Sequence, residues 1–329
     1  MRAVAIVNAH ARRLGARGQQ AIARALPGGV RFTASLDDAR EVIRAEIRRG
    51  VDLMVFGGGD GTVVMGLALL AEACRGAGAP EPAIGVLRLG SGNAFADAVN
   101  AGANPAADLE RLARGAGAWR EQPLLEVLGV RAPFVGMGID AQLLEDHAAV
   151  GRVVDRVPGG RWIGGGARYA LSVALRSVPR FALAARPHAI VTNAGAPAIE
   201  LGPDGATGRE IERGKELWRG ACTMVAGGAI PYFGFGLKMF AHAGKHARRF
   251  QLRCGDSSLV EMLRSAPAAF RGDYWSDRVH DFAVDRVAIA LDREAAIEAG
   301  GELLGRRSRI ELALGKSITI VELDSPSRS

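Results

Sequence analysis

The feature that most constrains this chain is a strand that ends in three glycines and an aspartate. Leu53–Phe56 is typical of a short buried strand, Val63–Ala73 has a helical pattern, and GGGDGT occupies Gly57–Thr62 between them. Glycines let the backbone turn tightly and approach a ligand, and the free N–H groups that open a helix suit a phosphate. A carboxylate at Asp60, inside such a turn, indicates a magnesium ion or a hydroxyl that must lose its proton. The segment therefore predicts a site for a nucleotide, a metal and an acceptor.

Two familiar phosphate-binding motifs do not fit this turn. No Gly-Lys-Ser/Thr follows it, so it is not a P-loop, and it does not have the Gly-x-Gly-x-x-Gly spacing of a dinucleotide-binding loop. The simplest alternative is an ordinary glycine-rich turn in an α/β domain.

A second loop of the same kind follows the next strand. Ala83–Leu87 is another short apolar run, and Gly90, Ser91, Gly92 and Asn93 come soon after it. These small residues again permit close backbone approach, and Ser91 and Asn93 add hydrogen-bonding side chains. In an open α/β sheet, ligands bind beyond the carboxyl ends of the strands, so the two loops are expected to form one cleft.

The two loops together resemble the diacylglycerol kinase catalytic family, which includes diacylglycerol, sphingosine and ceramide kinases. The resemblance rests on GGGDGT at Gly57–Thr62 and GSGNAFA at Gly90–Ala96. It implies ATP and Mg²⁺ as cofactors and transfer of the γ-phosphate to a lipid hydroxyl of a diacylglycerol, a ceramide or a sphingoid base. NAD kinases share the first loop, so an NAD kinase-like enzyme with a soluble acceptor is one alternative. A pseudokinase that binds nucleotide or lipid without turnover is another.

The texture of the sequence changes near residue 122. Strands and helices alternate over residues 1–122, where we expect a Rossmann-like α/β nucleotide-binding domain, with a broken helix over Asp97–Arg120. Short alternating runs over residues 123–329 indicate a β-rich domain, of β-sandwich type in the family. We expect the last strands of this region to pack back on the first domain. The resemblance implies an active site in the cleft between the domains.

The resemblance also implies which residues contact the nucleotide. These are Asn8, Thr33, Gly58, Gly59, Gly61, Thr62, Gly90, Ser91, Gly92 and Asn93. Asp60 is expected to position magnesium or to share the role of general base. Arg12 and its neighbours in the loop after the first strand have the chemistry to hold phosphate oxygens, although a solvated basic loop has the same composition.

Three segments of the second domain resemble family motifs. FVGMGIDA at Phe134–Ala141 implies that Asp140 faces the cleft and binds substrate, unless it only caps the helix that follows. Gly164–Val178 is expected to be a helix that lines an acyl-chain pocket. In AIEAGGELLGR, which begins at Ala296, Glu302 matches the glutamate of an Asp-Gly-Glu turn and is the candidate general base.

The chain departs from the family pattern at several positions. Gly300 stands where the turn has aspartate, Ala94 replaces an aspartate of the second loop, and Met65 replaces a common glutamate. Ala247 and Arg248 stand where bacterial relatives have an Asp-Gly pair that helps bind a structural magnesium. These departures keep the pseudokinase alternative open and leave the lipid acceptor undefined.

Composition agrees with this interpretation without deciding it. The chain has 329 residues, 48% of them hydrophobic, which is enough for two cores, and its formal charge of +7 favours an anionic membrane surface. Cys74, Cys222 and Cys254 are widely spaced and predict neither a disulfide nor a zinc site. We expect a cytoplasmic protein that associates peripherally with the inner face of the membrane. A lipid substrate is the expected partner, nucleic acid is not, and homodimerisation is left open.

Overall fold

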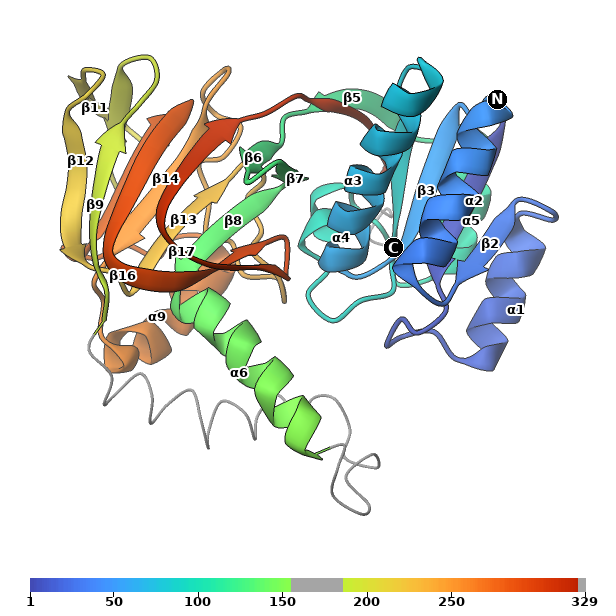
Figure 1. The fold of residues 1–329 in the computed structure, drawn as a ribbon, viewed down its shortest axis with the longest axis horizontal. Coiled ribbons are helices and arrows are strands. Elements are labelled where there is room, and N and C mark those ends of the chain that lie inside the picture. The colour runs from blue at the N-terminus through green and yellow to red at the C-terminus, as the bar shows by residue number, and fades with distance from the viewer. Residues whose placement is uncertain (155–185, 325–329) are drawn as a thin grey trace.

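The computed structural model describes residues 1–154 and 186–324, which form two sheets that lie side by side (Figure 1). The helix expected over Gly164–Val178 lies outside the described residues, as does the C-terminal tail after residue 324.

The first sheet has six strands in the order β2-β1-β3-β4-β18-β5. Its strands are β1 (Ala3–Asn8), β2 (Val30–Thr33), β3 (Leu53–Gly58), β4 (Ala83–Arg88), β5 (Ala118–Gln122) and β18 (Ile318–Glu322). All neighbouring strands run parallel except β18 and β5, which are antiparallel. The chain adds β2 on one side of β1 and then β3 on its other side. The carboxyl ends of β1 and β3 are therefore the place where sheets of this kind bind ligands.

Helices cover both faces of the first sheet. They are α1 (Ala16–Ala25), α2 (Leu36–Arg48), α3 (Asp60–Ala77), α4 (Ala94–Ala98) and α5 (Pro105–Ala113). One core cluster joins Ile22 of α1 and Leu109 of α5 to one face of the sheet. Another joins Ile43 of α2 and Leu67 of α3 to the other face. The alternation of strands and helices that the sequence predicts for residues 1–122 is therefore present from β1 to α5.

The second sheet is antiparallel and has twelve strands. They are β6 (Leu125–Val127), β7 (Val130–Ala132), β8 (Phe134–Gly138), β9 (His188–Asn193), β10 (Ala198–Leu201), β11 (Thr207–Ile211), β12 (Glu216–Ala221), β13 (Met224–Gly228), β14 (Phe250–Gly255), β15 (Val279–Val284), β16 (Arg286–Ala299) and β17 (Glu302–Leu314). Helix α6 (Ile139–Val154) follows β8, and α9 (Leu259–Arg271) follows β14.

The long strand β16 connects two arms of this sheet. Its first half pairs with β9 and its last residues pair with β8, while β17 runs beside both parts and its register shifts between them. Val191 and Trp218 from one arm share a core cluster with Phe250 and Cys254 from the other. The two arms of this continuous sheet thus contribute to a common core.

The two sheets share apolar contacts and exchange a strand. The cluster that contains Leu67 of α3 also contains Phe134 of β8 and Phe240 from the second region. After β17 the chain returns to the first sheet, where β18 lies between β4 and β5. The last strand therefore completes the sheet that the first strands begin.

One element predicted from the sequence is wrong. The helix expected over Asp97–Arg120 extends only through α4 and α5, and its last part is strand β5. Arg120 and its neighbours have a helix-favouring composition, but β5 pairs with β18 along its whole length and Arg120 Nε donates a hydrogen bond to Glu322 Oε2. Pairing with a distant strand overrides the local preference.

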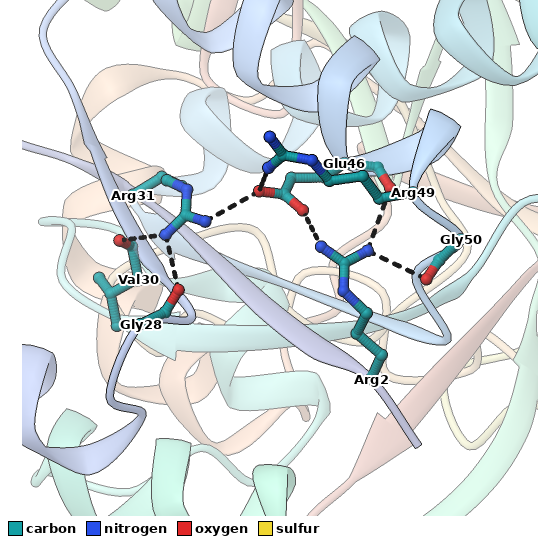
Figure 2. Close-up of polar contacts among 7 residues, drawn as sticks. All are labelled: Arg2, Gly28, Val30, Arg31, Glu46, Arg49 and Gly50. Atoms are coloured by element: carbon teal, nitrogen blue, oxygen red, sulfur yellow. Dashed lines mark hydrogen bonds and ion pairs between the residues drawn. The ribbon is translucent and has the colours of Figure 1, made fainter.

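The buried carboxylate of Glu46 connects α2 to β2 and to the start of β1 at the edge of the first sheet (Figure 2). Glu46 of α2 is only 1% exposed. It forms ion pairs with Arg2 before β1, with Arg31 of β2 at 3.1 Å, and with Arg49 at 3.2 Å. Arg2 also donates to the carbonyl of Gly50 at 3.0 Å. This cluster is far along the strands from the glycine loops, so we assign it to stability.

Candidate active site

The two glycine loops touch through their backbones. They follow β3 and β4, which are neighbours, and Leu89 N donates to the carbonyl of Gly58 at 3.2 Å. A Cβ atom added to Gly90 would lie 2.2 Å from the Cα of Gly59. Glycine at position 90 is thus required for the backbones of the two loops to come into contact. The two loops therefore lie next to each other, as the sequence predicts.

Asp60 holds the second loop against the first helix. It is the first residue of α3, and its Oδ1 and Oδ2 accept hydrogen bonds from Phe95 N at 2.9 Å and Ala94 N at 3.1 Å. These N–H groups open α4, whose positive dipole end favours a carboxylate. Burial nevertheless raises the pKa of Asp60 above its ordinary value.

Glu302 reaches the same place from the second sheet. It begins β17, directly after the turn that joins β16 to β17, and a Cβ added to Gly61 would lie 1.9 Å from Glu302 Oε1. The carboxylate therefore rests on the backbone of the first glycine loop. Burial raises the pKa of Glu302 above its ordinary value, as a general base requires.

The turn before Glu302 has no room for the aspartate found in the family. Gly300 has a φ of +55° and Gly301 a φ of +85°, both in the left-handed region. A Cβ at position 300 would also lie 2.4 Å from Val64 Cγ2 of α3. The Val64 side chain thus occupies the space that a side chain at position 300 would need.

The structure adds a carboxyl group that the sequence analysis missed. Glu298 near the end of β16 is 1% exposed, and its Oε2 accepts a hydrogen bond from Gly301 N at 2.8 Å. A Cβ added to Gly136 would lie 3.0 Å from Glu298 Oε1 and 1.7 Å from Asp140 Oδ2, so the two carboxyl groups approach one point. The signal in the sequence is a single charge inside the apolar run from Ala295 to Ala299.

Asp140 lies in the first turn of α6, and its carboxyl group is buried. Neither carboxylate oxygen has a hydrogen-bond partner, and Glu298 Oε1 has none either. Burial raises the pKa of Asp140 to about 6, and it raises the pKa of Glu298 well above its ordinary value, with the charge of Asp140 adding to the effect.

These groups line one pocket of about 480 Å³ between the two sheets. Its polar wall carries Asp60, Asp140, Glu298 and Glu302. Its other wall is largely apolar and comes from the second region and the start of α6: Phe134, Leu143, Leu144, Phe233, Phe235 and Leu237. Among the residues predicted to bind nucleotide, Gly59, Gly61, Ser91 and Gly92 reach this pocket.

The remaining predicted nucleotide residues lie beside the pocket rather than in its lining. Asn8 ends β1 opposite Thr33 of β2, and Asn8 Nδ2 donates to Thr62 Oγ1 at 3.4 Å. Thr62 packs over Gly58, where a Cβ would lie 2.4 Å from the threonine side chain. Asn8, Thr33 and Thr62 therefore gather at the crevice between β1 and β3, on the other side of the first loop.

Asn93 shapes its own loop instead of pointing to a ligand. It is 2% exposed and has a φ of 56°. Its Oδ1 accepts from Gly90 N at 2.9 Å, and its Nδ2 donates to the carbonyl of Gly90 at 2.8 Å. Since both polar atoms of the side chain are engaged, Asn93 fixes the loop conformation and is a positioning residue in this structure.

Two basic residues, Arg12 and Arg249, differ in their surroundings. Arg12 lines the pocket, and its Nη1 donates to Ser91 Oγ at 3.3 Å. Arg249, in the loop that lacks the Asp-Gly pair, instead donates to the carbonyls of Pro197 at 2.5 Å and Ala283 at 3.2 Å. Arg12 is therefore the better placed of the two to meet a ligand.

The donor set fits a magnesium ion that arrives with a nucleotide. Among the described residues there is no group of three or more side chains that could hold a metal ion alone. Mg²⁺ at phosphates usually takes one or two carboxylates and keeps several waters, and each oxygen of Asp60 has lone pairs left beside its single N–H donor. Asp60 is thus a suitable protein ligand for this ion.

Comparisons with known proteins point to one family and one fold. The family model of the diacylglycerol kinase catalytic domain matches residues 2–118. A crystal structure of a diacylglycerol kinase from Bacillus anthracis str. Sterne is similar with a TM-score of 0.60 at 16% identity, over 98% of this chain and 96% of that chain.

Two further structures from that organism, described under the same enzyme name, have TM-scores of 0.65 and 0.61. Their identities are 17% and 18%, over 98% and 97% of this chain and 95% and 96% of theirs. At such identities the likeness concerns the fold, which extends over both sheets. No curated protein matches this chain in sequence.

Proposed function

We propose that this chain, whose residues 2–118 match the model of the diacylglycerol kinase catalytic domain, is an ATP-dependent lipid kinase that phosphorylates a hydroxyl group. The observation that carries the proposal is the convergence of Asp60, Glu302 and both glycine loops on one pocket with an apolar wall. Phosphoryl transfer asks a protein mainly for positioning and charge neutralisation, and this arrangement offers both.

The nucleotide binds along the carboxyl ends of β1, β3 and β4. The backbone N–H groups of Gly59 and Gly61, together with those of Ser91 and Gly92, face its phosphates, while Asn8 and Thr33 lie toward its nucleoside end. Arg12, beside Ser91, neutralises charge on the γ-phosphate. Asn93 contributes through the loop shape that it fixes.

Glu302 acts as the general base. The acceptor hydroxyl forms a bond to the γ-phosphorus, the bond from that phosphorus to the bridging oxygen of ADP breaks, and the hydroxyl proton passes to the Glu302 carboxylate. The raised pKa of Glu302 makes it a stronger base than an exposed glutamate. Gly61 holds the carboxylate in place because it leaves room for Oε1.

Asp60 is the residue that would hold a magnesium ion, which would neutralise charge on the phosphate oxygens. The two N–H groups that bind Asp60 keep its carboxylate fixed between the loops. Loss of this carboxylate therefore removes both a metal ligand and the clamp between the loops.

The acyl chain of the acceptor lies against the apolar wall, with its hydroxyl toward Glu302. Phe235 is 57% exposed at this wall, which suits a pocket that opens to a lipid surface. No helix within the described residues is long and apolar enough to cross a membrane. With a formal charge of +7, peripheral attachment to the anionic inner face of the membrane from the cytoplasm is the mode of access we propose.

Transfer of labelled γ-phosphate from ATP and Mg²⁺ tests the proposal. The acceptors are diacylglycerol, ceramide and sphingosine in mixed micelles, with NAD as a soluble acceptor and Asp60→Ala as the matched variant. We expect a labelled lipid that Asp60→Ala does not form. Product on NAD alone would move the function to a soluble acceptor. ATP binding without any product would leave a nucleotide-binding pseudokinase and contradict the proposal.

A further inference from the structure

Helix α9 carries large apolar side chains that are open to solvent. Val260 in its first turn is 55% exposed, and Phe270 in its last turn is 49% exposed. Trp275, in the turn that follows the helix, is 44% exposed. A single exposed apolar side chain is ordinary, but three on one helix and its adjoining turn indicate a surface that meets an apolar partner.

Arginines lie among these apolar side chains. Arg264 and Arg271 are exposed, and together with Val260 they recur at positions i, i+4 and i+11, which share one stripe of a helix. Glu261, the one acidic residue of α9, lies off this stripe. Arg271 pairs with Asp273 at 3.0 Å, and an ion pair as exposed as this one contributes little free energy and opens easily. The outer face of α9 therefore combines apolar and cationic groups.

The opposite face of α9 packs against the apolar wall of the pocket. Ala269 is buried in a cluster with Tyr274, and Leu237, which lines the pocket, packs on this cluster. The backbone N–H of Lys238 donates to the carbonyl of Ala269 at 2.9 Å. The segment that bears Leu237 and Phe235 therefore rests on the C-terminal half of α9.

Helix α9 also leaves the second sheet at the same end as α6, which contributes Leu143 and Leu144 to the pocket. Met224 of β13 pairs with Gly138, the last residue of β8, and with Gly255, the last residue of β14. Helix α6 begins directly after β8, and α9 begins soon after β14 (Figure 1). The exposed face of α9 and the apolar wall of the pocket thus lie at one end of this sheet.

We propose that the outer face of α9 and the turn after it dock on an anionic lipid bilayer, with Phe270 and Trp275 below the head groups and Arg264 at the lipid phosphates. This α9 docking face gives a surface to the peripheral attachment proposed above, and the inference rests on that lipid kinase function. A helix with apolar side chains and arginines on its exposed face can lie in the plane of a membrane interface, where tryptophan is also favoured.

The neighbouring pocket favours a bilayer over a protein partner. An acyl chain has to pass from the lipid to the apolar wall, and Phe235 at this wall is itself exposed. Docking through α9 brings this wall to the lipid surface, because the segment that contains Phe235 is bound to the helix through Lys238. The formal charge of +7 adds attraction to anionic head groups.

Co-sedimentation of the full chain with lipid vesicles tests the α9 docking face without turnover. The vesicles contain phosphatidylcholine alone or with an equal part of phosphatidylglycerol. The wild type is compared with Phe270→Ala and with two matched pairs of variants. Trp275→Ala is paired with Trp119→Ala, since Trp119 of β5 is 49% exposed, and Arg264→Gln is paired with Arg24→Gln, since Arg24 of α1 is also exposed.

We expect the wild type to bind the anionic vesicles, and Phe270→Ala and Trp275→Ala to bind them about tenfold more weakly because an apolar side chain is lost from the lipid. Arg264→Gln should bind about fivefold more weakly, a difference that high salt should remove. Trp119→Ala and Arg24→Gln should bind as the wild type. Phe270→Ala should also raise KM for a lipid acceptor in vesicles, with KM for ATP unchanged. Thermal unfolding checks the fold of each variant.

A wild type that stays in the supernatant with anionic vesicles would overturn the inference and leave this face to a protein partner. Equal binding of the wild type and the α9 variants would overturn it as well. Vesicle binding that depends on Phe270 and Trp275, without label on any lipid, would support the α9 docking face and contradict the kinase function. Labelled lipid with vesicle binding that no α9 variant weakens would support the kinase function and contradict the α9 docking face.

Discussion

Gly61 shows how one missing methyl group can make room for a carboxyl group from another element. Glu302 Oε1 lies where a side chain at position 61 would begin, at 1.9 Å from an added Cβ. Real Cβ atoms do not approach an oxygen so closely, so an alanine here must displace the carboxylate. The identity of residue 61 and the position of the Glu302 carboxyl group are therefore coupled, although Gly61 lies in α3 and Glu302 begins β17.

We expect Gly61→Ala to lower kcat by about 100-fold, the scale of a misplaced reacting group, while ATP binding changes little. Gly76→Ala, in the same helix, is the matched control because nothing lies within 4 Å of its added Cβ. The control should stabilise the protein by about 0.5–1 kcal/mol, since alanine favours a helix more than glycine does. Steady-state kinetics and urea unfolding of both variants check this. Equal kcat in the two variants would contradict the contact.

The pH dependence of the reaction should report Glu302. A general base works as the carboxylate, so kcat/KM should be full at high pH and fall as the pH drops through the pKa of Glu302. Because burial raises this pKa, the fall should occur above pH 4.5, the ordinary value for glutamate. Glu302→Gln should lower kcat by about 10²–10⁴-fold.

Measured rates of both proteins across the stable pH range provide the test, with tryptophan fluorescence as the control for folding. A Glu302→Gln variant that is folded and keeps the wild-type rate and pH profile would remove Glu302 from the role of base.

At the scale of elements, α3 and the turn between β16 and β17 are fitted to each other. Val64 of α3 occupies the space next to Gly300, whose φ of +55° already disfavours most side chains. Restoring the family's aspartate therefore requires space that Val64 now fills.

Gly300→Asp should destabilise the protein by about 1–3 kcal/mol, from the left-handed backbone and the contact with Val64. Adding Val64→Ala should recover part of this loss, giving a coupling energy of about 0.5–2 kcal/mol in a double-mutant cycle. Urea unfolding of the four proteins measures it. Additive effects of the two substitutions would show that the turn and α3 do not constrain each other.

The sequence predicted correctly those helices and strands that depend mainly on neighbouring residues in the chain. The strands before the two glycine loops and the helix after the first loop follow from short apolar runs and from glycine, and they lie close to where the sequence predicts them. The local sequence did not predict strand β5, because Arg120 is part of a strand only through its pairing with β18. Glu298 was missed for a related reason: its meaning depends on Asp140, which a different element brings beside it. Contacts between distant segments leave little trace in the pattern of either segment.

At the scale of the molecule, the chain returns to its starting sheet. Five strands of the first sheet come from the first 122 residues. The sixth, β18, lies between β4 and β5 and comes from residues 318–322. The core cluster that contains Leu67 also includes Met224 and Phe240. The two regions are therefore expected to unfold together, although the catalytic family matches only residues 2–118.

A fragment of residues 1–122 should not fold stably, because β5 loses its partner β18 and the apolar face toward the second region becomes exposed. Circular dichroism and thermal unfolding of the fragment and of the full chain compare the two. The full chain should give one transition, and a cooperative transition of the isolated fragment would contradict this account.

The central claim is that the glycine loops, Asp60 and Glu302 form one site for phosphoryl transfer to a lipid. The most direct measurement is the initial rate at which label from γ-labelled ATP enters the organic phase, for the wild type, Asp60→Asn and Glu302→Gln, with Glu294→Gln as control. The account predicts labelled lipid from the wild type and the control, and at least about 100-fold less from the other two variants. Equal rates from all four proteins, or no labelled lipid from a wild type that binds ATP, would contradict it.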